Sequence, residues 1–195
     1  MHARSREDVY FSLDIEADGP IPGVYSMLSL GVCLAGRFDG RRFAPADHSE
    51  PTFYVELRPI SERVDPAALE VARLDRAALA RSGMDPAAAM RELCAFLEAN
   101  ADGGRPIVCA YPAGFDWTFL YWYLVRFGPE ELPLSFNSVL DVKTMYAVRA
   151  RVPFDRAGLE DLPAELRGRH PHTHNALDDA IQQAEVFCAL FSWHA

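Results

Sequence analysis

Residues 8–16 read DVYFSLDIE, an apolar run that ends in a pair of acidic residues. Aromatic and β-branched residues favour strands, and turn residues follow in DGPIPG at 18–23. We therefore predict a largely buried strand over 8–15 whose end opens onto a loop. Residues two apart on a strand point to the same side, so Asp14 and Glu16 would present two carboxylates together beside that loop.

The segments on either side of this strand predict the rest of the sheet. Two more apolar runs, 26–35 and 52–57, are separated by short turns, which is typical of an antiparallel meander. Proline at the first helical position marks an alanine-rich helix after Asp65 and another after Asp85, which runs to about Asn100.

In the second half of the chain, predicted strands and helices alternate. Residues 106–111 form a short continuous apolar run, as in a buried strand, and an aromatic-rich helix follows over 115–127. A short strand is expected near 138–140, and apolar residues at helical spacing predict a last helix over 175–191. This order predicts an α/β fold, a mixed sheet flanked by helices, in one domain over residues 1–195.

Composition limits the class of protein. Half of the 195 residues are hydrophobic and 24% are charged, as in globular proteins, and no apolar stretch is long enough to cross a membrane. The first eight residues lack an apolar signal core, so a cytoplasmic location is expected. The four cysteines lie in apolar runs without C-x-x-C spacing, which favours buried, reduced thiols.

The charge is unevenly distributed. A net charge of −9 argues against coating nucleic acid by bulk attraction. Segment 143–174 nevertheless holds six basic and four acidic residues, together with three of the six histidines. Such a strip could hold a polyanion at one place, and it is equally compatible with a solvated face.

Two acidic residues and one histidine extend the candidate site beyond the first strand. Asp116 follows the predicted strand 106–111 at the start of a helix, where an aspartate alone would be explained by the helix dipole. His174 precedes the last helix and Asp179 lies in its first turns, so a loop histidine and a helical carboxylate can converge. We assign the neighbouring Asp178 to the helix dipole.

These motifs, in this order, resemble the DEDDh class of 3′–5′ exonucleases. That class includes the proofreading subunits of bacterial replicative polymerases, ribonuclease T and oligoribonuclease. The resemblance rests on Asp14-Ile15-Glu16, Phe115-Asp116 and the run from His174 to Ala180, and it covers nearly the whole chain. It implies an RNase H-like fold with a five-stranded mixed sheet.

The resemblance also implies two Mg²⁺ or Mn²⁺ ions and assigns residues to them. Asp14, Glu16 and Asp179 would hold one ion. Asp14 would bridge to the second, supported by Asp116, and His174 would be the general base. Two ions about 4 Å apart can bind both the attacking and the departing oxygen of a phosphodiester, so the chemistry is consistent with the residue types.

The expected reaction is removal of 5′-mononucleotides from single-stranded 3′ ends. The small size and acidic balance favour RNA or short oligonucleotides, while a DNA proofreading or repair nuclease and a non-catalytic nucleic-acid-binding module stay open as alternatives. The protein would act alone or as a homodimer. Candidate substrate contacts are Ala17, Met27, Trp117, Arg167, Arg169 and His172, although Met27 and most aromatic residues also fit a core.

Residues 170–174 read HPHTH, with three histidines at alternate positions. Alternating histidines can bind zinc. The run lacks the H-x-H-x-D-H spacing of binuclear zinc hydrolases, so an independent zinc site is not expected, and His172 is interpreted as a loop residue near phosphate.

Overall fold

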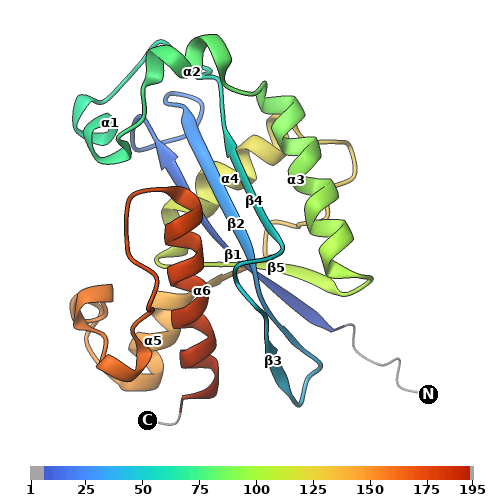
Figure 1. The fold of residues 1–195 in the computed structure, drawn as a ribbon, viewed down its shortest axis with the longest axis vertical. Helices are drawn as coiled ribbons and strands as arrows, with labels where there is room; N and C mark the ends of the chain where they lie inside the picture. Colours follow the sequence, from blue (N-terminus) through green and yellow to red (C-terminus); the bar gives the residue numbers. More distant parts are fainter. Residues whose placement is uncertain (1–6, 194–195) are drawn as a thin grey trace.

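The computed structural model describes residues 7–193, and these form a mixed sheet with helices on both faces (Figure 1). The strand order is β3-β2-β1-β5-β6, and β4 also pairs with β2. The strands are β1 (Asp8–Ala17), β2 (Met27–Phe38), β3 (Phe43–Pro45), β4 (Thr52–Glu56), β5 (Arg105–Ala110) and β6 (Val139–Asp141).

The helices occupy the positions that the sequence pattern indicates, with some additions. They are α1 (Pro66–Ala72), α2 (Arg76–Ser82), α3 (Pro86–Ala101), α4 (Ala113–Phe127), α5 (Val142–Ala150) and α6 (Ala176–Ser192). Three short 3₁₀ turns lie between α5 and α6: η1 (Phe154–Arg156), η2 (Leu159–Asp161) and η3 (Ala164–Leu166). Within the described residues, no helix has the length and apolar character needed to cross a bilayer.

The sheet confirms the predicted mixture of strand directions. β1 pairs with β2 and β2 with β4 in antiparallel fashion, whereas β1, β5 and β6 run parallel. The sixth strand, β3, was not predicted; it is three residues long and pairs with the end of β2 after a turn. A five-stranded sheet is therefore a correct description of the main layer, to which β3 adds a short edge.

The predicted helix after Asp65 is in fact two helices. α1 ends where Arg73 adopts a left-handed conformation (φ 54°), and Asp75 then caps α2 by accepting from the Ala78 N–H. The predicted proline starts of α1 and α3 are confirmed, each preceded by a capping aspartate.

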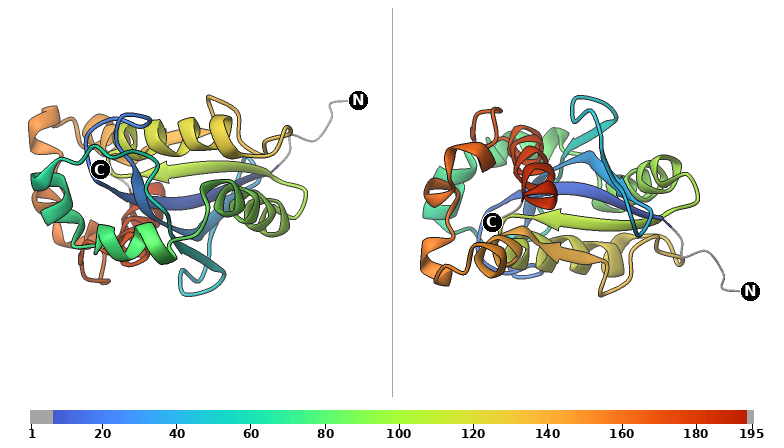
Figure 2. Two further views of the ribbon diagram at one scale, coloured as in Figure 1. Left: turned by 90° about the horizontal axis from the view of Figure 1, so that it is seen from above. Right: turned by 90° about the horizontal axis from the view of Figure 1, so that it is seen from below.

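Two hydrophobic cores lie on the two faces of the sheet. On one face, α3 and α4 pack against the odd-numbered residues of β1 from Val9 to Ile15. On the other, α5 and α6 pack against Tyr10, Cys33 and Cys109. Figure 2 shows the helices on both sides of the strands. The four cysteines are free, as expected, and three of them are fully buried.

Candidate active site

Strand alternation turns the first acidic pair toward α6. The odd-numbered side chains of β1 are buried under α3 and α4, so Asp14 and Glu16 point to the opposite face of the sheet. Asp14 Oδ1 accepts a 2.8 Å hydrogen bond from Gln183 Nε2 on α6. The Glu16 side chain is buried at 8% exposure, at the end of the strand where a bulge follows.

Close packing of α6 on β2 brings the last carboxylate to this pair. Gly31 lies opposite Asp14 in the strand register, and a Cβ atom there would lie 2.3 Å from the backbone of Ala176. Only glycine allows this approach. As a result, the ligand oxygens of Asp14, Glu16 and Asp179 all lie within 4.8 Å of one another.

Asp116 joins the group from the other side of β1. It lies in the first turn of α4, is 6% exposed, and its Oδ1 accepts from the Ile15 N–H at 3.1 Å. Since Ile15 separates Asp14 from Glu16, this bond places the Asp116 carboxylate beside both. The structure thus brings together the four carboxylates that the sequence singled out.

Burial, together with neighbouring negative charges, raises the pKa of Asp14, Glu16 and Asp116. For Asp14, burial is the largest cause, followed by the charges of Asp116 and Glu16, and its pKa lies well above the ordinary value. Burial followed by the charge of Asp179 raises the pKa of Glu16 to about 8. Burial raises the pKa of Asp116 to about 7, opposed by its backbone hydrogen bonds.

This donor set fits a divalent cation. Buried carboxylates with raised pKa values lack a sufficient counter-charge, and the positive charge of Arg73 only partly lowers the pKa of Glu16. Oxygen ligands of this kind suit Mg²⁺ and Mn²⁺. Asp14, Glu16, Asp116 and Asp179 are therefore the residues that could bind metal ions.

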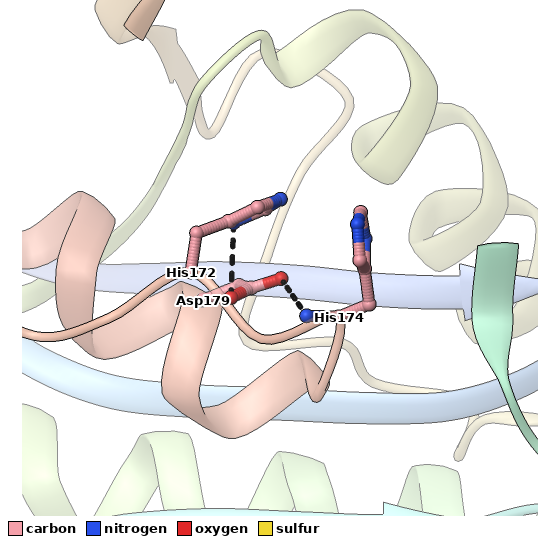
Figure 3. A group of neighbouring side chains, drawn as sticks. All are labelled: His172, His174 and Asp179. Carbon is pink, nitrogen blue, oxygen red and sulfur yellow. Dashed lines mark hydrogen bonds and ion pairs between the residues drawn. The ribbon is translucent and has the colours of Figure 1, made fainter. Parts of the chain in front are cut away.

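His174 lies on the loop before α6, next to Asp179 (Figure 3). Its backbone is left-handed (φ 59°), a conformation uncommon for residues other than glycine. Its N–H donates to Asp179 Oδ2 at 3.1 Å, and the Thr173 N–H donates to Asp179 Oδ1 at 2.8 Å. The same carboxylate thus ties the loop to the helix.

The candidate substrate contacts near the first strand divide between core and surface. Met27 is fully buried and packs in the core, with its N–H bound to the Tyr123 hydroxyl at 2.8 Å, so its side chain offers no surface to a base. This corrects its candidate role as a substrate contact. Ala17 is 6% exposed at the end of β1. Trp117 is half-buried on α4, with its ring stacked on Tyr121 at 5.2 Å.

The basic candidates have other partners. Arg167 Nε donates to the Leu162 carbonyl at 2.8 Å, which ties down the loop after η2. The backbone N–H of Arg169 donates to Glu185, roughly two turns beyond Asp179 along α6. None of these contacts involves the four carboxylates, whereas His172 Nδ1 lies 3.0 Å from Asp179 Oδ1.

Residues 83–187 match the family described as Exonuclease (RNase_T), which is more than half of the chain. The chain is also 32% identical over 186 residues to the 3′-5′ DNA exonuclease Cap18 of Escherichia coli, covering 94% of this chain and 92% of that protein. The chain belongs to the exonuclease family. The resemblance to DEDDh-class 3′–5′ exonucleases is confirmed.

Solved exonuclease structures share the fold. The nuclease domain of 3′hExo, a DEDDh family member bound to rAMP, aligns with a TM-score of 0.70 at 15% identity, over 98% of this chain and 94% of that one. A structure of exonuclease I aligns with a TM-score of 0.63 at 16% identity over 95% of this chain. The aligned region covers only 40% of the exonuclease I chain.

Sequence reasoning missed Gln183. This buried amide donates to Asp14 and accepts from the Tyr111 N–H at 2.7 Å, so it connects α6 to β1 and to the end of β5. One signal was available, because Gln183 lies four residues after Asp179 and thus on the same face of the helix.

Proposed function

We propose that this exonuclease removes 5′-mononucleotides one at a time from the 3′ end of single-stranded nucleic acid, using two bound Mg²⁺ or Mn²⁺ ions. The convergence of Asp14, Glu16 and Asp179 within 4.8 Å is the observation that carries the proposal. We further propose that residues 1–195 act as one exonuclease domain in the cytoplasm.

Asp14, Glu16 and Asp179 would hold one ion, and Asp14 with Asp116 would hold the other. When bound, such ions favour ionisation of water and stabilise charge on the departing oxygen. The protein's part is to keep four carboxylates together despite their repulsion. Hydrogen bonds from Gln183 to Asp14 and from Ile15 to Asp116 fix the orientation of two of them.

His174 is the proposed general base. Imidazole exchanges protons near neutral pH, and the position of His174 next to Asp179 puts a proton acceptor at the rim of the carboxylate group. The hydrogen bond between its N–H and Asp179 holds the loop in place. His174 would take the proton of the attacking water, which then displaces the 3′ oxygen of the next nucleotide.

We propose single-stranded DNA as the preferred substrate. The support is the 32% identity to a DNA exonuclease across nearly the full length of both chains. RNA and short oligonucleotides, which small size and acidic charge favour, are the second candidate, and the 3′hExo nuclease domain has been seen with a bound ribonucleotide. Ala17, Trp117, Arg167, Arg169 and His172 remain proposed substrate contacts.

The test uses 5′-labelled single-stranded DNA and RNA of one sequence, each incubated with the protein and Mg²⁺ or Mn²⁺. We expect a ladder that shortens from the 3′ end, faster on DNA, and lost both with EDTA and in Asp14→Ala. Faster RNA shortening would reverse the substrate preference. Binding of either strand without cleavage would instead indicate a non-catalytic binding module.

The candidate site is complete within one chain. All five residues, Asp14, Glu16, Asp116, His174 and Asp179, come from a single copy, so a homodimer would carry two full sites. Specific activity should therefore not depend on protein concentration, and light scattering at the same concentrations reports whether the proposed homodimer forms.

A further inference from the structure

A second group of ligand atoms adjoins the carboxylates. One ring nitrogen each of His172 and His174 and an oxygen of Asp179 lie within 4.8 Å of one another. The two rings lie edge to face, with centroids 4.6 Å apart and 69° between their planes. Figure 3 shows both rings on the same side of the loop, with the Asp179 carboxylate between their bases.

The backbone holds this arrangement in place. Thr173 and His174 donate their N–H groups to the two oxygens of Asp179, so the carboxylate is already oriented by the loop that carries both histidines. Asp179 itself is 1% exposed, while the His172 side chain is 44% exposed. A dissolved ion can therefore reach the group from the histidine side.

Ligand chemistry separates this group from the four carboxylates. Imidazole nitrogen suits Zn²⁺ and related transition-metal ions, whereas Mg²⁺ prefers an all-oxygen set. Two ligands of a tetrahedral zinc ion with bonds of about 2.0 Å lie about 3.3 Å apart. The separation of 3.0 Å between His172 Nδ1 and Asp179 Oδ1 is close to that value, so little movement would admit the ion.

We propose that His172, His174 and Asp179 form a binding site for Zn²⁺, and that an ion bound there inhibits the nuclease. Asp179 belongs to both groups, so a zinc ion would draw it away from the carboxylate set and occupy His174. Three protein ligands leave one position open, which is typical of catalytic rather than structural zinc sites. Spacing of the histidines alone did not indicate this site, because α6 supplies the third ligand.

Isothermal titration calorimetry with ZnCl₂, in the absence of Mg²⁺, tests binding without relying on activity. We expect His172→Ala and His172→Gln to weaken zinc binding at least about tenfold. His170→Ala is the matched control, since His170 lies 3.1 Å from Asp178 and outside the group, and it should bind as the wild type does.

Asp14→Asn distinguishes the two sets of ligands. It removes a carboxylate that the zinc group does not use, so zinc binding should persist within about twofold of the wild type, in keeping with the small effects of changes outside a site. If Asp14→Asn abolishes zinc binding, or if both His172 variants bind like the wild type, the proposed site is wrong. Thermal unfolding of every variant identifies any that fails to fold.

The inhibitory role, which rests on the proposed function, is tested by titrating Zn²⁺ against cleavage at fixed Mg²⁺. Each variant is compared with its own rate before zinc is added. We expect the half-inhibiting concentration to rise about tenfold or more in His172→Ala and to stay unchanged in His170→Ala. Zinc that supports cleavage, or inhibits both variants equally, would overturn this role. If the substrates tested are not cleaved at all, calorimetry still decides the site.

Discussion

Gln183 shows how one buried side chain can connect parts of a site that are far apart in sequence. Its amide nitrogen donates to Asp14 on β1, and its amide oxygen accepts from Tyr111 after β5. The bond to Tyr111 is buried, so water cannot replace the amide at the Tyr111 N–H, whereas the bond to Asp14 is only partly buried. The orientation of a carboxylate in the candidate site thus depends on a residue that is itself neither acidic nor basic.

Gln183→Leu should therefore affect both stability and activity. It leaves the Tyr111 N–H unpaired and Asp14 free to rotate, which we expect to cost about 1–3 kcal/mol in the free energy of unfolding. Activity should fall about 10–100-fold, mainly in kcat. Urea unfolding and steady-state kinetics measure the two effects. Gln182→Leu is the control, because its Oε1 is buried without a partner, and an equal loss there would contradict the role of Gln183.

Replacing His174 tests the proposed base. His174→Ala should lower kcat about 10²–10⁴-fold through loss of proton transfer, while Mg²⁺ and Mn²⁺ binding persists because the four carboxylates remain. Single-turnover cleavage measures the loss of rate, and Mn²⁺ titration measures whether metal binding persists. His170→Ala, in the same loop, should stay within a few-fold of the wild type. A full rate in His174→Ala would remove its role.

At the scale of elements, the site depends on how closely α6 lies against β2. Gly31 leaves room for the backbone of Ala176, and this contact sets the height of the α6 N-terminus above Asp14. Asn175 then caps the helix by accepting from Leu177 and Asp178, which fixes where the first turn begins. Asp179 reaches the acidic pair only when both conditions hold.

Gly31→Ala should displace that helix end. We expect a loss of about 1–3 kcal/mol in stability from overpacking. We also expect a fall of about 10²-fold in activity, because the acids separate. Differential scanning calorimetry and cleavage assays measure these. Gly114→Ala serves as control, since a Cβ there meets no atom within 4 Å, and it should change neither quantity much. If both variants lose stability and activity to the same extent, the contact between Gly31 and Ala176 does not position α6.

A buried ion pair holds α2 to the turn after β1. Arg76 Nε lies 2.7 Å from Asp18 Oδ2, and the Asp18 side chain is fully buried. Arg76→Ala leaves that carboxylate without its partner, so we expect a loss of about 3–5 kcal/mol in unfolding free energy. Arg81→Ala, exposed on the same helix, should change stability by less than about 0.5 kcal/mol. Comparable urea midpoints for the two variants would contradict this assignment.

Over the whole molecule, the crowded acids link stability to pH. The pKa of Glu16 is raised to about 8 and that of Asp116 to about 7, above the value of about 4 expected in the unfolded chain. Between about pH 4 and pH 8, the folded state therefore binds more protons than the unfolded state. Through these groups, stability should therefore fall as pH rises from about 4 to 8 without metal.

Thermal unfolding at pH 5 and pH 8, with EDTA and with Mg²⁺, measures this linkage. Without metal the midpoint should be lower at pH 8, and Mg²⁺ should raise it more at pH 8 than at pH 5 because ligands must be ionised to bind. In the double variant Asp14→Asn, Glu16→Gln, the unfolding midpoint should depend less on pH and less on Mg²⁺. If the midpoint of that variant depends on pH and Mg²⁺ as in the wild type, residues other than these two cause the linkage.

Local sequence was sufficient to predict much of the fold and to select the candidate site residues. Apolar runs predicted the main strands, proline and aspartate marked the starts of α1 and α3, and the predicted helix start at Asn175 is confirmed. The boundary that sequence missed, the break between α1 and α2, depends on a left-handed Arg73, which no propensity predicts. The three-residue β3 was also missed, because it forms only by pairing with β2.

The sequence by itself determined which acids and which histidine are available, since residue type and the alternation of side chains along β1 are local properties. Tertiary structure alone decided that Met27 is core, that Gln183 orients Asp14, and that His172 lies against Asp179. The physical reason is the separation along the chain over which each effect acts. Strand and helix periodicity acts over a few residues, whereas the approach of α6 to Gly31 joins elements separated by more than half of the chain.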